Sequence, residues 1–467
     1  MKESRYNFFI NDNEDNIHLI YNAFKNTLVS DEDCKVQNFI NQCNENIVCN
    51  QKYITKEEFN DLVLCGIIVS DEMDEKKFTI DRNKKHLELL HQNNTTLSLV
   101  ITPTLQCNFR CYYCFENMTI RKNEEYITME VQNDIIKFIL KSITENHLKE
   151  VNITWYGGEP LIQKDIIFSM QKKINELCKY YNIKLDSYII TNGILLSPET
   201  CNLLYEYGIR LIQVTIDGPE HIHNKRRIYP ANPNNNYNLI FENILNSNIN
   251  IRFQIRINID KTNKDFIFEL IDDLIQRKIW PYKKNVSIYT APVESGRKTD
   301  LPPKEFFILQ DQIRYYLMKK YTEINHHLVG KAKLEFFYPK LGGNMRCGYG
   351  VAKNSWVISY NGDLFRCWEF VGQNEHKVGT IKDLLEDFGN LIFEKIKVDN
   401  KTFERWGCFD CKYFPICGSK CPWNFIKNNE ERKCTDWKNI LEYRILSQYK
   451  LFLKTPEIFK NVPFNVL

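Results

Sequence analysis

Long apolar runs are missing from the sequence. No segment approaches the length of about 18 consecutive apolar residues that a membrane-spanning helix needs. The first residues, MKESRYNFF, also lack the apolar stretch of a secretion signal. A charge imbalance is missing too, because 62 Lys and Arg face 59 Asp and Glu, for a formal net charge of +3. We therefore expect a cytoplasmic protein that binds neither nucleic acid nor an acidic membrane surface.

Internal repeats are absent as well. The one biased tract is the Asn-rich ANPNNNYN at residues 231–238, for which we expect a surface loop. Of the 467 residues, 43% are hydrophobic and 26% are charged, which is the composition of a globular protein. A chain of this length suffices for two or three domains, each with an ordinary hydrophobic core.

Cysteine is the residue type in excess, with 16 in the chain. A disulfide scaffold fits poorly, because the cytoplasm keeps thiols reduced and the chain is large enough to build cores without cross-links. Clustered cysteines under reducing conditions indicate bound metal instead. Two clusters are present: Cys107, Cys111 and Cys114, and then Cys347, Cys367, Cys408, Cys411, Cys417, Cys421 and Cys434. For Cys34, Cys43, Cys49, Cys65, Cys178 and Cys201 we expect buried apolar thiols.

The distribution of cysteines and of apolar patterns predicts three domains. Residues 1–95 are expected to form a small α+β domain, with helices near 31–43 and 55–65. Thr55 and Glu58 have the spacing of a helix-capping box. After these helices, residues 66–80 predict a short strand pair, and the charged stretch 70–87 predicts a linker.

Residues 96–300 are expected to form an α/β domain with a parallel sheet, because strand and helix patterns alternate. Strands are predicted at 96–104, 150–156, 184–192, 210–217, 250–258 and 285–292. Helices are predicted near 127–147, 162–180, 197–207, 236–247 and 263–278. Residues 301–467 are expected to begin with a helix near 302–322 and to continue as a strand-poor, cysteine-rich region whose order depends on bound metal.

The first cysteine cluster has the sequence CNFRCYYC at residues 107–114 and follows the first predicted strand directly. Three thiolates on one loop can hold three irons of a 4Fe–4S cube and leave the fourth iron open for a substrate or cofactor. A zinc site would usually show paired CxxC units and a fourth ligand nearby, and none lies within ten residues of this loop.

This arrangement resembles the radical S-adenosylmethionine (SAM) superfamily, which has a CxxxCxxC loop with an aromatic residue, here Tyr113, directly before the last cysteine. The second strand ends in the matching motif Gly157, Gly158, Glu159 and Pro160. The resemblance implies a partial (β/α)6 barrel. It implies that SAM chelates the open iron, that the glutamate-containing motif binds its amino group, and that one electron splits it into a 5′-deoxyadenosyl radical. It further implies cofactor-binding roles for Thr191, Asn192, Asp217, Arg227 and Arg256.

The second cysteine cluster resembles the SPASM domain of radical SAM peptide and protein maturases. Matched by position, one auxiliary 4Fe–4S cluster is assigned Cys408, Cys411, Cys417 and Cys434, and the other Cys347, Cys367 and Cys421. The resemblance therefore implies three clusters in all. The second auxiliary cluster is one thiolate short. We hypothesise that a cysteine of a peptide substrate fills this position, and the alternatives are a ligand other than cysteine or a cluster that only relays electrons.

The resemblance implies an enzyme that oxidatively modifies a ribosomally made precursor peptide, forming a thioether or another cross-link. An electron donor such as flavodoxin or ferredoxin is implied, and a winged-helix-like domain at residues 1–95 would bind the leader of the peptide. One alternative is a maturase of the sulfatase-maturing type. Its relatives place an acidic residue directly after the cysteine that matches Cys367, whereas here Trp368 follows and Glu369 comes next. Another is a non-catalytic, zinc-stapled binding protein.

Overall fold

The structure is a computed structural model, and it describes residues 1–42, 47–48, 52–92, 95–114, 125–247, 250–293, 298–324, 352–386, 389–396, 399–417, 434 and 437–454. The described residues fall into two compact units. The sheet unit contains those within His91–Tyr321 and Gly348–Lys397. The terminal unit contains those within Met1–Leu90, Thr322–Cys347 and Val398–Leu467. The boundaries of the three predicted domains stay a prediction.

A large parallel sheet organises the sheet unit, as predicted. All six predicted strands are confirmed: β6 (Thr96–Ile101), β8 (Glu150–Trp155), β9 (Lys184–Thr191), β10 (Leu211–Thr215), β12 (Arg252–Ile259) and β13 (Val286–Pro292). They lie in the order β13-β12-β10-β9-β8-β6, each parallel to its neighbour. Consecutive residues are buried at the carboxyl ends of β6, β8 and β10, whereas in β12 buried residues alternate with partly exposed ones.

The sheet continues beyond β6 with a segment that comes more than 250 residues later in the chain. β14 (Ser355–Ile358) pairs parallel with β6, and β15 (Asp363–Phe365) and β16 (Gly379–Thr380) follow as antiparallel strands. The expectation that residues 301–467 are poor in strands is therefore wrong for this part. The short run SWVI has both faces buried, and the turn at Asn361 and Gly362 reverses the chain into β15.

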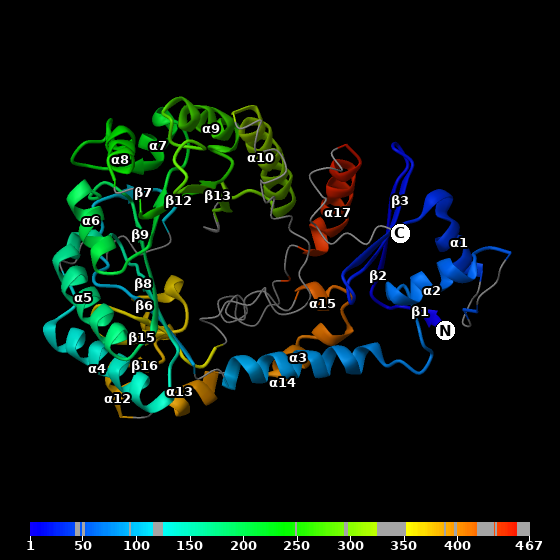
Figure 1. The fold of residues 1–467 in the computed structure, drawn as a ribbon, viewed down its shortest axis with the longest axis horizontal. Helices are drawn as coiled ribbons and strands as arrows, with labels where there is room; N and C mark the ends of the chain where they lie inside the picture. Colours follow the sequence, from blue (N-terminus) through cyan, green and yellow to red (C-terminus); the bar gives the residue numbers. More distant parts are fainter. Residues whose placement is uncertain are drawn as a thin grey trace. The chain divides into compact units, whose positions relative to one another are not determined.

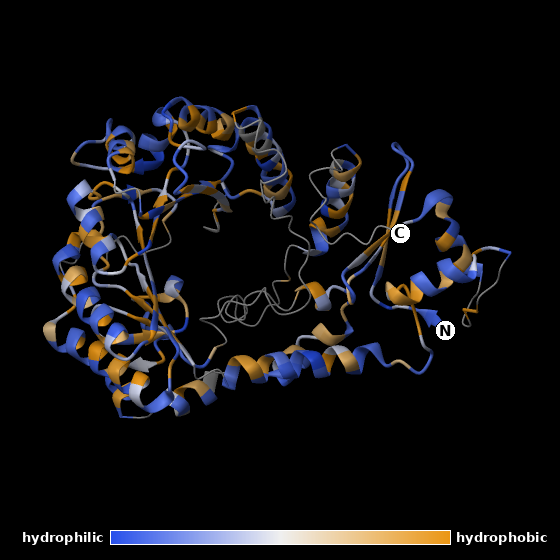
Figure 2. Ribbon diagram, viewed as in Figure 1, coloured by the Kyte–Doolittle hydropathy of each residue, from blue (hydrophilic) through white to orange (hydrophobic). Residues whose placement is uncertain are grey.

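Helices lie on the outer side of this sheet (Figure 1). The predicted helices are confirmed as α4 (Met129–Asn146), α5 (Lys164–Tyr180), α6 (Pro198–Glu206), α8 (Asn236–Leu245), α9 (Ile267–Gln276) and α10 (Pro303–Ile324). The unit also contains α7 (Glu220–Arg226), α12 (Ile381–Leu385), α13 (Gly389–Ile396) and the 3-10 helices η3 (Pro160–Gln163), η4 (Lys264–Phe266), η6 (Trp368–Phe370) and η7 (Asn374–His376). The side chains of Thr128 and Ser197 cap α4 and α6. Hydrophobic and hydrophilic residues are interspersed along these helices (Figure 2), as in amphipathic helices that pack one face against a core.

The terminal unit has α+β character, as predicted. Its antiparallel strands are β2 (Asn7–Asp12), β3 (Ile17–Asn22) and β4 (Thr27–Ser30), and β1 (Lys2–Glu3) pairs with β5 (Ile68–Val69). Its helices are η1 (Glu32–Cys34), α1 (Lys35–Gln42), α2 (Lys56–Leu64), α14 (Asn400–Arg405), η8 (Cys408–Asp410), α15 (Phe414–Cys417) and α17 (Trp437–Lys454). α3 (Glu75–Gln92) begins in this unit. In the described part of the chain, no helix is long and apolar enough to cross a bilayer.

Two local expectations for the first residues have opposite outcomes. The capping box is confirmed, because the Glu58 amide donates to Thr55 Oγ1 at 3.1 Å and the Thr55 amide donates to Glu58 Oε2 at 2.7 Å. The charged linker at 70–87 is wrong, because α3 covers most of it. The buried face of α3 includes Thr79, Asn83 and Leu87 at helical spacing. Two of these three residues are polar, so the sequence lacks the apolar periodicity that would have predicted a buried helix face.

Candidate active site

The cysteine loop, residues 107–114, leaves the carboxyl end of β6, where parallel sheets gather their functional groups. Within it, β7 (Arg110–Cys111) pairs antiparallel with β11 (Arg227–Ile228). Cys107 and Cys111 are buried and Cys114 is half-buried. The Phe109 amide donates a hydrogen bond to Cys107 Sγ at 3.4 Å. The loop therefore has a defined conformation and polar support for a thiolate sulfur.

One cavity of about 490 Å³ brings this loop together with most of the other predicted site residues. All three cysteines of the loop line it. The predicted cofactor-binding residues that line it are Gly157, Gly158, Thr191, Asn192, Arg227 and Arg256. The ends of β8, β9 and β12 and the start of β11 thus contribute to a single site.

Glu159, Pro160 and Asp217 are not among the residues that line this cavity, and their cofactor-binding roles stay predictions. The buried Glu159 carboxylate accepts hydrogen bonds from the Thr191 hydroxyl and from the Asn192 amide, both at 2.7 Å. Burial raises the pKa of Glu159, although these hydrogen bonds act in the opposite direction. In this structure the side chain joins the end of β8 to the end of β9 and so shapes the cavity wall.

The two glycines allow close contact with the chain that leads into the cysteine loop. Gly157 has a φ of +130°, and a Cβ atom there would lie 2.3 Å from the Thr104 carbonyl oxygen. A Cβ atom on Gly158 would lie 2.3 Å from the carbonyl oxygen of Gln106. The Glu159 amide then donates to that same oxygen at 2.8 Å. Glycine is therefore required here for contact with the protein itself, in addition to any approach to a ligand.

The substitution Gly158→Ala is expected to displace the backbone before Cys107, because the new methyl group meets carbonyl oxygens that cannot rotate away. We expect a loss of stability of about 1–3 kcal/mol, as for other overpacked sites, and weaker SAM binding by equilibrium dialysis. The matched control is Gly379→Ala, whose Cβ would meet the end of the Ile392 side chain at 2.8 Å. Equal effects of the two substitutions on SAM binding would contradict this role for Gly158.

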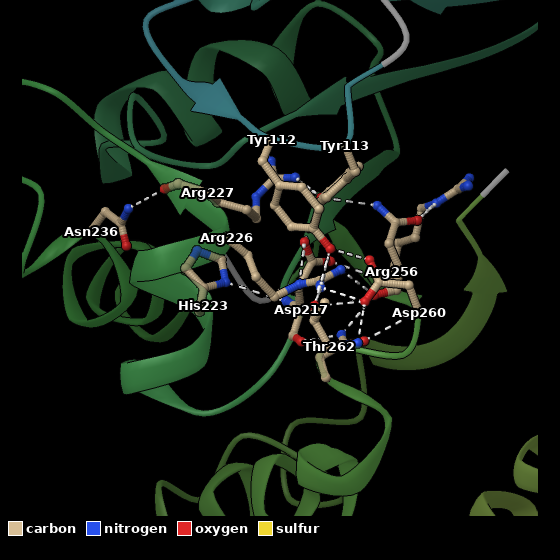
Figure 3. A network of polar contacts seen from close by, with 12 residues as sticks. Tyr112, Tyr113, Asp217, His223, Arg226, Arg227, Asn236, Arg256, Asp260 and Thr262 are labelled. Atoms are coloured by element: carbon tan, nitrogen blue, oxygen red, sulfur yellow. Dashed lines mark hydrogen bonds and ion pairs between the residues drawn. The ribbon is translucent and has the colours of Figure 1, made fainter. Parts of the chain in front are cut away.

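Two tyrosines of the cysteine loop are held by buried charged residues (Figure 3). The Tyr113 hydroxyl donates to Asp217 and accepts from Arg227 Nη1 at 2.6 Å. The Tyr112 hydroxyl donates to Asp260 and accepts from Arg226 Nη1 at 2.7 Å. Sequence reasoning missed Tyr112, Arg226 and Asp260, since nothing in their spacing connects residues more than 100 positions apart.

Arg226 and Asp260 form a buried ion pair, with Arg226 Nη1 2.8 Å from Asp260 Oδ1. Asp260 Oδ1 also accepts hydrogen bonds from the amide and the hydroxyl of Thr262, both at 2.7 Å. Burial acts to raise the pKa of Asp260, but the hydrogen bonds from Arg226, Tyr112 and Thr262 outweigh it, and the pKa lies below its usual value. The pair fixes the cysteine loop to the end of β12.

The lining of the cavity also includes the two residues that follow Cys367. Trp368 and Glu369 both line the cavity. The Trp368 ring packs against the Tyr156 ring with their centroids 5.7 Å apart. Tyr156 directly precedes the two glycines, so this aromatic pair connects the end of β8 to η6.

The remaining predicted ligands are only partly described. Cys347 and Cys421 lie outside the described residues. Cys408 is buried, Cys411 and Cys417 are half-buried, and Cys434 is exposed. Cys408 begins η8 and Cys417 ends α15, and the Cys411 amide donates to the Cys408 carbonyl at 3.1 Å. Their assignment to auxiliary clusters stays a prediction.

The class of the protein follows from this fold and from a family comparison. A parallel sheet covered by helices brings three thiols and two close-packed glycines to one cavity. Residues 101–274 match the family model described as the radical SAM superfamily. This part of the chain is a radical SAM domain, and the protein is an enzyme.

Two related enzymes and one solved structure are similar to most of this chain. The serine-type anaerobic sulfatase-maturating enzyme of Bacteroides thetaiotaomicron is 23% identical over 400 residues, or 77% of this chain and 92% of the relative. The cysteine-type enzyme of Clostridium novyi is 23% identical over 370 residues, or 75% of this chain and 96% of the relative. The solved structure of native anSMEcpe with bound AdoMet and Cp18Cys peptide gives a TM-score of 0.54 at 21% identity, over 78% of this chain and 98% of that one. The last likeness shows a shared fold.

The residues present fit the SAM and the 4Fe–4S cluster that the family implies. The deciding observation is Arg227, a buried cation at the cavity whose Nε has no hydrogen-bond partner among the described residues. A buried cation of this kind favours an anionic group beside it, as a thiolate-bound cluster is. Across the described ranges, no three or more His, Cys, Asp or Glu side chains are close enough to hold a single metal ion. A 4Fe–4S cube is larger than one ion, so the three thiolates of the loop would hold it at a wider spacing than a single metal ion requires.

Proposed function

We propose that this enzyme reductively cleaves SAM to a 5′-deoxyadenosyl radical and oxidatively modifies a ribosomally made peptide, forming a thioether or another cross-link. The observation that carries the proposal is the single cavity lined by Cys107, Cys111 and Cys114 together with Gly157 and Gly158. It combines three cluster ligands with a backbone surface for a cofactor. A cytoplasmic location and an electron donor such as flavodoxin or ferredoxin belong to the same proposal.

Some residues of the cavity would bind the 4Fe–4S cluster, and others would bind SAM. Cys107, Cys111 and Cys114 would hold a 4Fe–4S cluster, and that cluster would supply the electron that splits SAM. Gly157 and Gly158 would present peptide groups to the amino group of SAM. Asn192 Nδ2 donates to Asn108 Oδ1 at 2.7 Å and so holds the end of β9 against the cysteine loop. These contacts would keep SAM and the thiolates in one orientation.

A peptide is the substrate class that the comparisons favour. The related structure is described with a bound peptide, and the related enzymes are named for the maturation of a protein. Two auxiliary clusters, held by the SPASM cysteines, would take up the extra electron or bind a substrate thiol at the position that lacks a protein thiolate. This part of the proposal rests on the positions of the cysteines in the sequence.

The terminal unit offers a place for the leader of such a peptide. Its sheet has the order β2-β3-β4, so β4 is an end strand. An extended leader could add to such an edge through main-chain hydrogen bonds. The proposal for residues 1–95 is therefore leader binding by strand addition.

A second function, the maturation of a sulfatase, is favoured by one specific observation. Glu369 lines the cavity and gives it a carboxylate, although Trp368 stands at the position where such maturases have their acidic residue. Packing of Trp368 against Tyr156 makes this position an aromatic wall. For this reason we rank peptide cross-linking first.

Mass spectrometry of the reaction product distinguishes the two functions. The anaerobically reconstituted protein is given SAM, a reductant and a cysteine-containing peptide encoded beside its gene. Cross-linking predicts the loss of two hydrogen atoms with all sulfur retained and no new aldehyde. Formylglycine formation removes sulfur from a cysteine or two hydrogen atoms from a serine, and in both cases it creates an aldehyde that a hydrazide reagent labels. Formation of 5′-deoxyadenosine without any change in such peptides would contradict the peptide proposal and leave SAM cleavage intact.

A further inference from the structure

Arg227 lies directly opposite Cys111. The antiparallel pair of β7 and β11 sets these two residues as Cα partners. Side chains of directly opposed residues lie on the same face of a strand pair, within contact distance of each other. Both residues also line the cavity of the cysteine loop. The Arg227 guanidinium is therefore next to a predicted cluster ligand.

The charge of Arg227 has no carboxylate in direct contact. Among the described residues, no Asp or Glu oxygen lies within 4.0 Å of its guanidinium nitrogens, and Arg227 is only 7% exposed. Its Nη1 donates to the Tyr113 hydroxyl, which in turn donates to Asp217. The carboxylates of Asp217 and Glu159 interact electrostatically with Arg227 from a greater distance. The guanidinium also lies over the Phe109 ring, 5.7 Å from its centroid.

The neighbouring Arg226 provides a contrast within the same chain. It is buried as well, but Asp260 neutralises it at 2.8 Å. Arginine keeps its proton at every accessible pH, so Arg227 is a permanent positive charge opposite Cys111.

We propose that Arg227 sets the reduction potential of the cluster held by the cysteine loop, raising it through the positive charge beside Cys111. The inference rests on the proposed assignment of that cluster to Cys107, Cys111 and Cys114. Uptake of one electron makes the cluster and its thiolates more negative, and a nearby buried cation stabilises this reduced state. Cluster charge and hydrogen bonds near the sulfurs are recognised determinants of iron–sulfur potentials.

The test is a redox titration of the reconstituted full-length protein without SAM, followed by electron paramagnetic resonance. The signal of this cluster is the one lost in a chain in which Cys107, Cys111 and Cys114 are all alanine. Arg227→Gln is expected to shift its midpoint potential to a lower value. Arg227→Lys, which keeps the charge, is expected to shift it less. Arg256→Gln is the matched control, because this second cavity arginine contacts Asn258 and Tyr289 instead of the loop.

The possible outcomes separate this inference from the proposed function. An unchanged potential in Arg227→Gln, with the cluster signal present, overturns the role of Arg227 and leaves the assignment of the cluster standing. Weaker SAM binding with an unchanged potential also overturns it, since Arg227 would then serve only the cofactor. A wild-type chain without this signal contradicts the proposed function itself. Should Arg227→Gln fail to fold, Arg227→Met takes its place: a lower midpoint potential in Arg227→Met than in Arg227→Lys supports the inference, and equal potentials in these two variants overturn it.

Discussion

Replacement of Cys111 by alanine is expected to abolish the cleavage of SAM and to remove the cluster of the cysteine loop. The loop supplies three thiolates, so the loss of one leaves two for a cube that needs three to stay bound with one iron open. We expect less iron per chain, lower absorption of the thiolate-to-iron bands, and 5′-deoxyadenosine at the level of a reaction without enzyme.

The control for this substitution is Cys178→Ala. Cys178 lies on α5 and is 1% exposed, and burial raises the pKa of its thiol to about 11, so it is a buried, protonated thiol without a cluster role. Iron content and SAM cleavage are expected to stay at the wild-type level in this variant. Cleavage of SAM by Cys111→Ala at the wild-type rate would disprove the assignment of the active site.

Replacement of Asp260 by asparagine is expected to destabilise the sheet unit by about 3–5 kcal/mol, the usual effect of breaking a buried ion pair from one side. The substitution leaves Arg226 buried, with Asp217 3.8 Å away as its remaining carboxylate. Asp260 also holds Tyr112, so the effect should concentrate in the cysteine loop. Hydrogen exchange of residues 110–113 and 226–228 is expected to accelerate more than that of α5.

Glu130→Gln is the matched control, because it removes a carboxylate from an ion pair of similar length. Glu130 and Lys382 lie 2.7 Å apart in the same unit, but both side chains are exposed. Exposed pairs contribute little to stability, so exchange should stay unchanged in this variant. If Asp260→Asn behaved like Glu130→Gln, the ion pair would not be what fixes the loop.

The parallel core of the fold was predictable from the sequence, because its strands are short β-branched runs between clear helical patterns. In β8 the polar residues Glu150, Asn152 and Thr154 alternate with the buried Val151, Ile153 and Trp155, which is the period-two pattern of a strand. β14 was missed because a run of four residues in a cysteine-rich context carries little weight. Its place beside β6 depends on pairing across the chain, which local patterns do not contain.

The cavity was predictable where a motif marked it and unpredictable where only the fold assembled it. The cysteine loop and the two glycines were found because each has a characteristic spacing. Arg226 and Asp260 have none, and they meet because α7 and the end of β12 converge on Tyr112. The hydrogen bond from the Thr191 hydroxyl to the Glu159 carboxylate was not predicted, since a sequence motif does not reveal where a side chain points.

The pairing of β14 with β6 has a consequence for how the chain is made. During synthesis β6 emerges early, whereas its neighbour at Ser355–Ile358 leaves the ribosome only after more than 250 further residues. Until then one side of β6 presents unpaired main-chain groups that other strands could occupy. The nascent protein should therefore depend on chaperones over this interval, and a product truncated near residue 300 should aggregate.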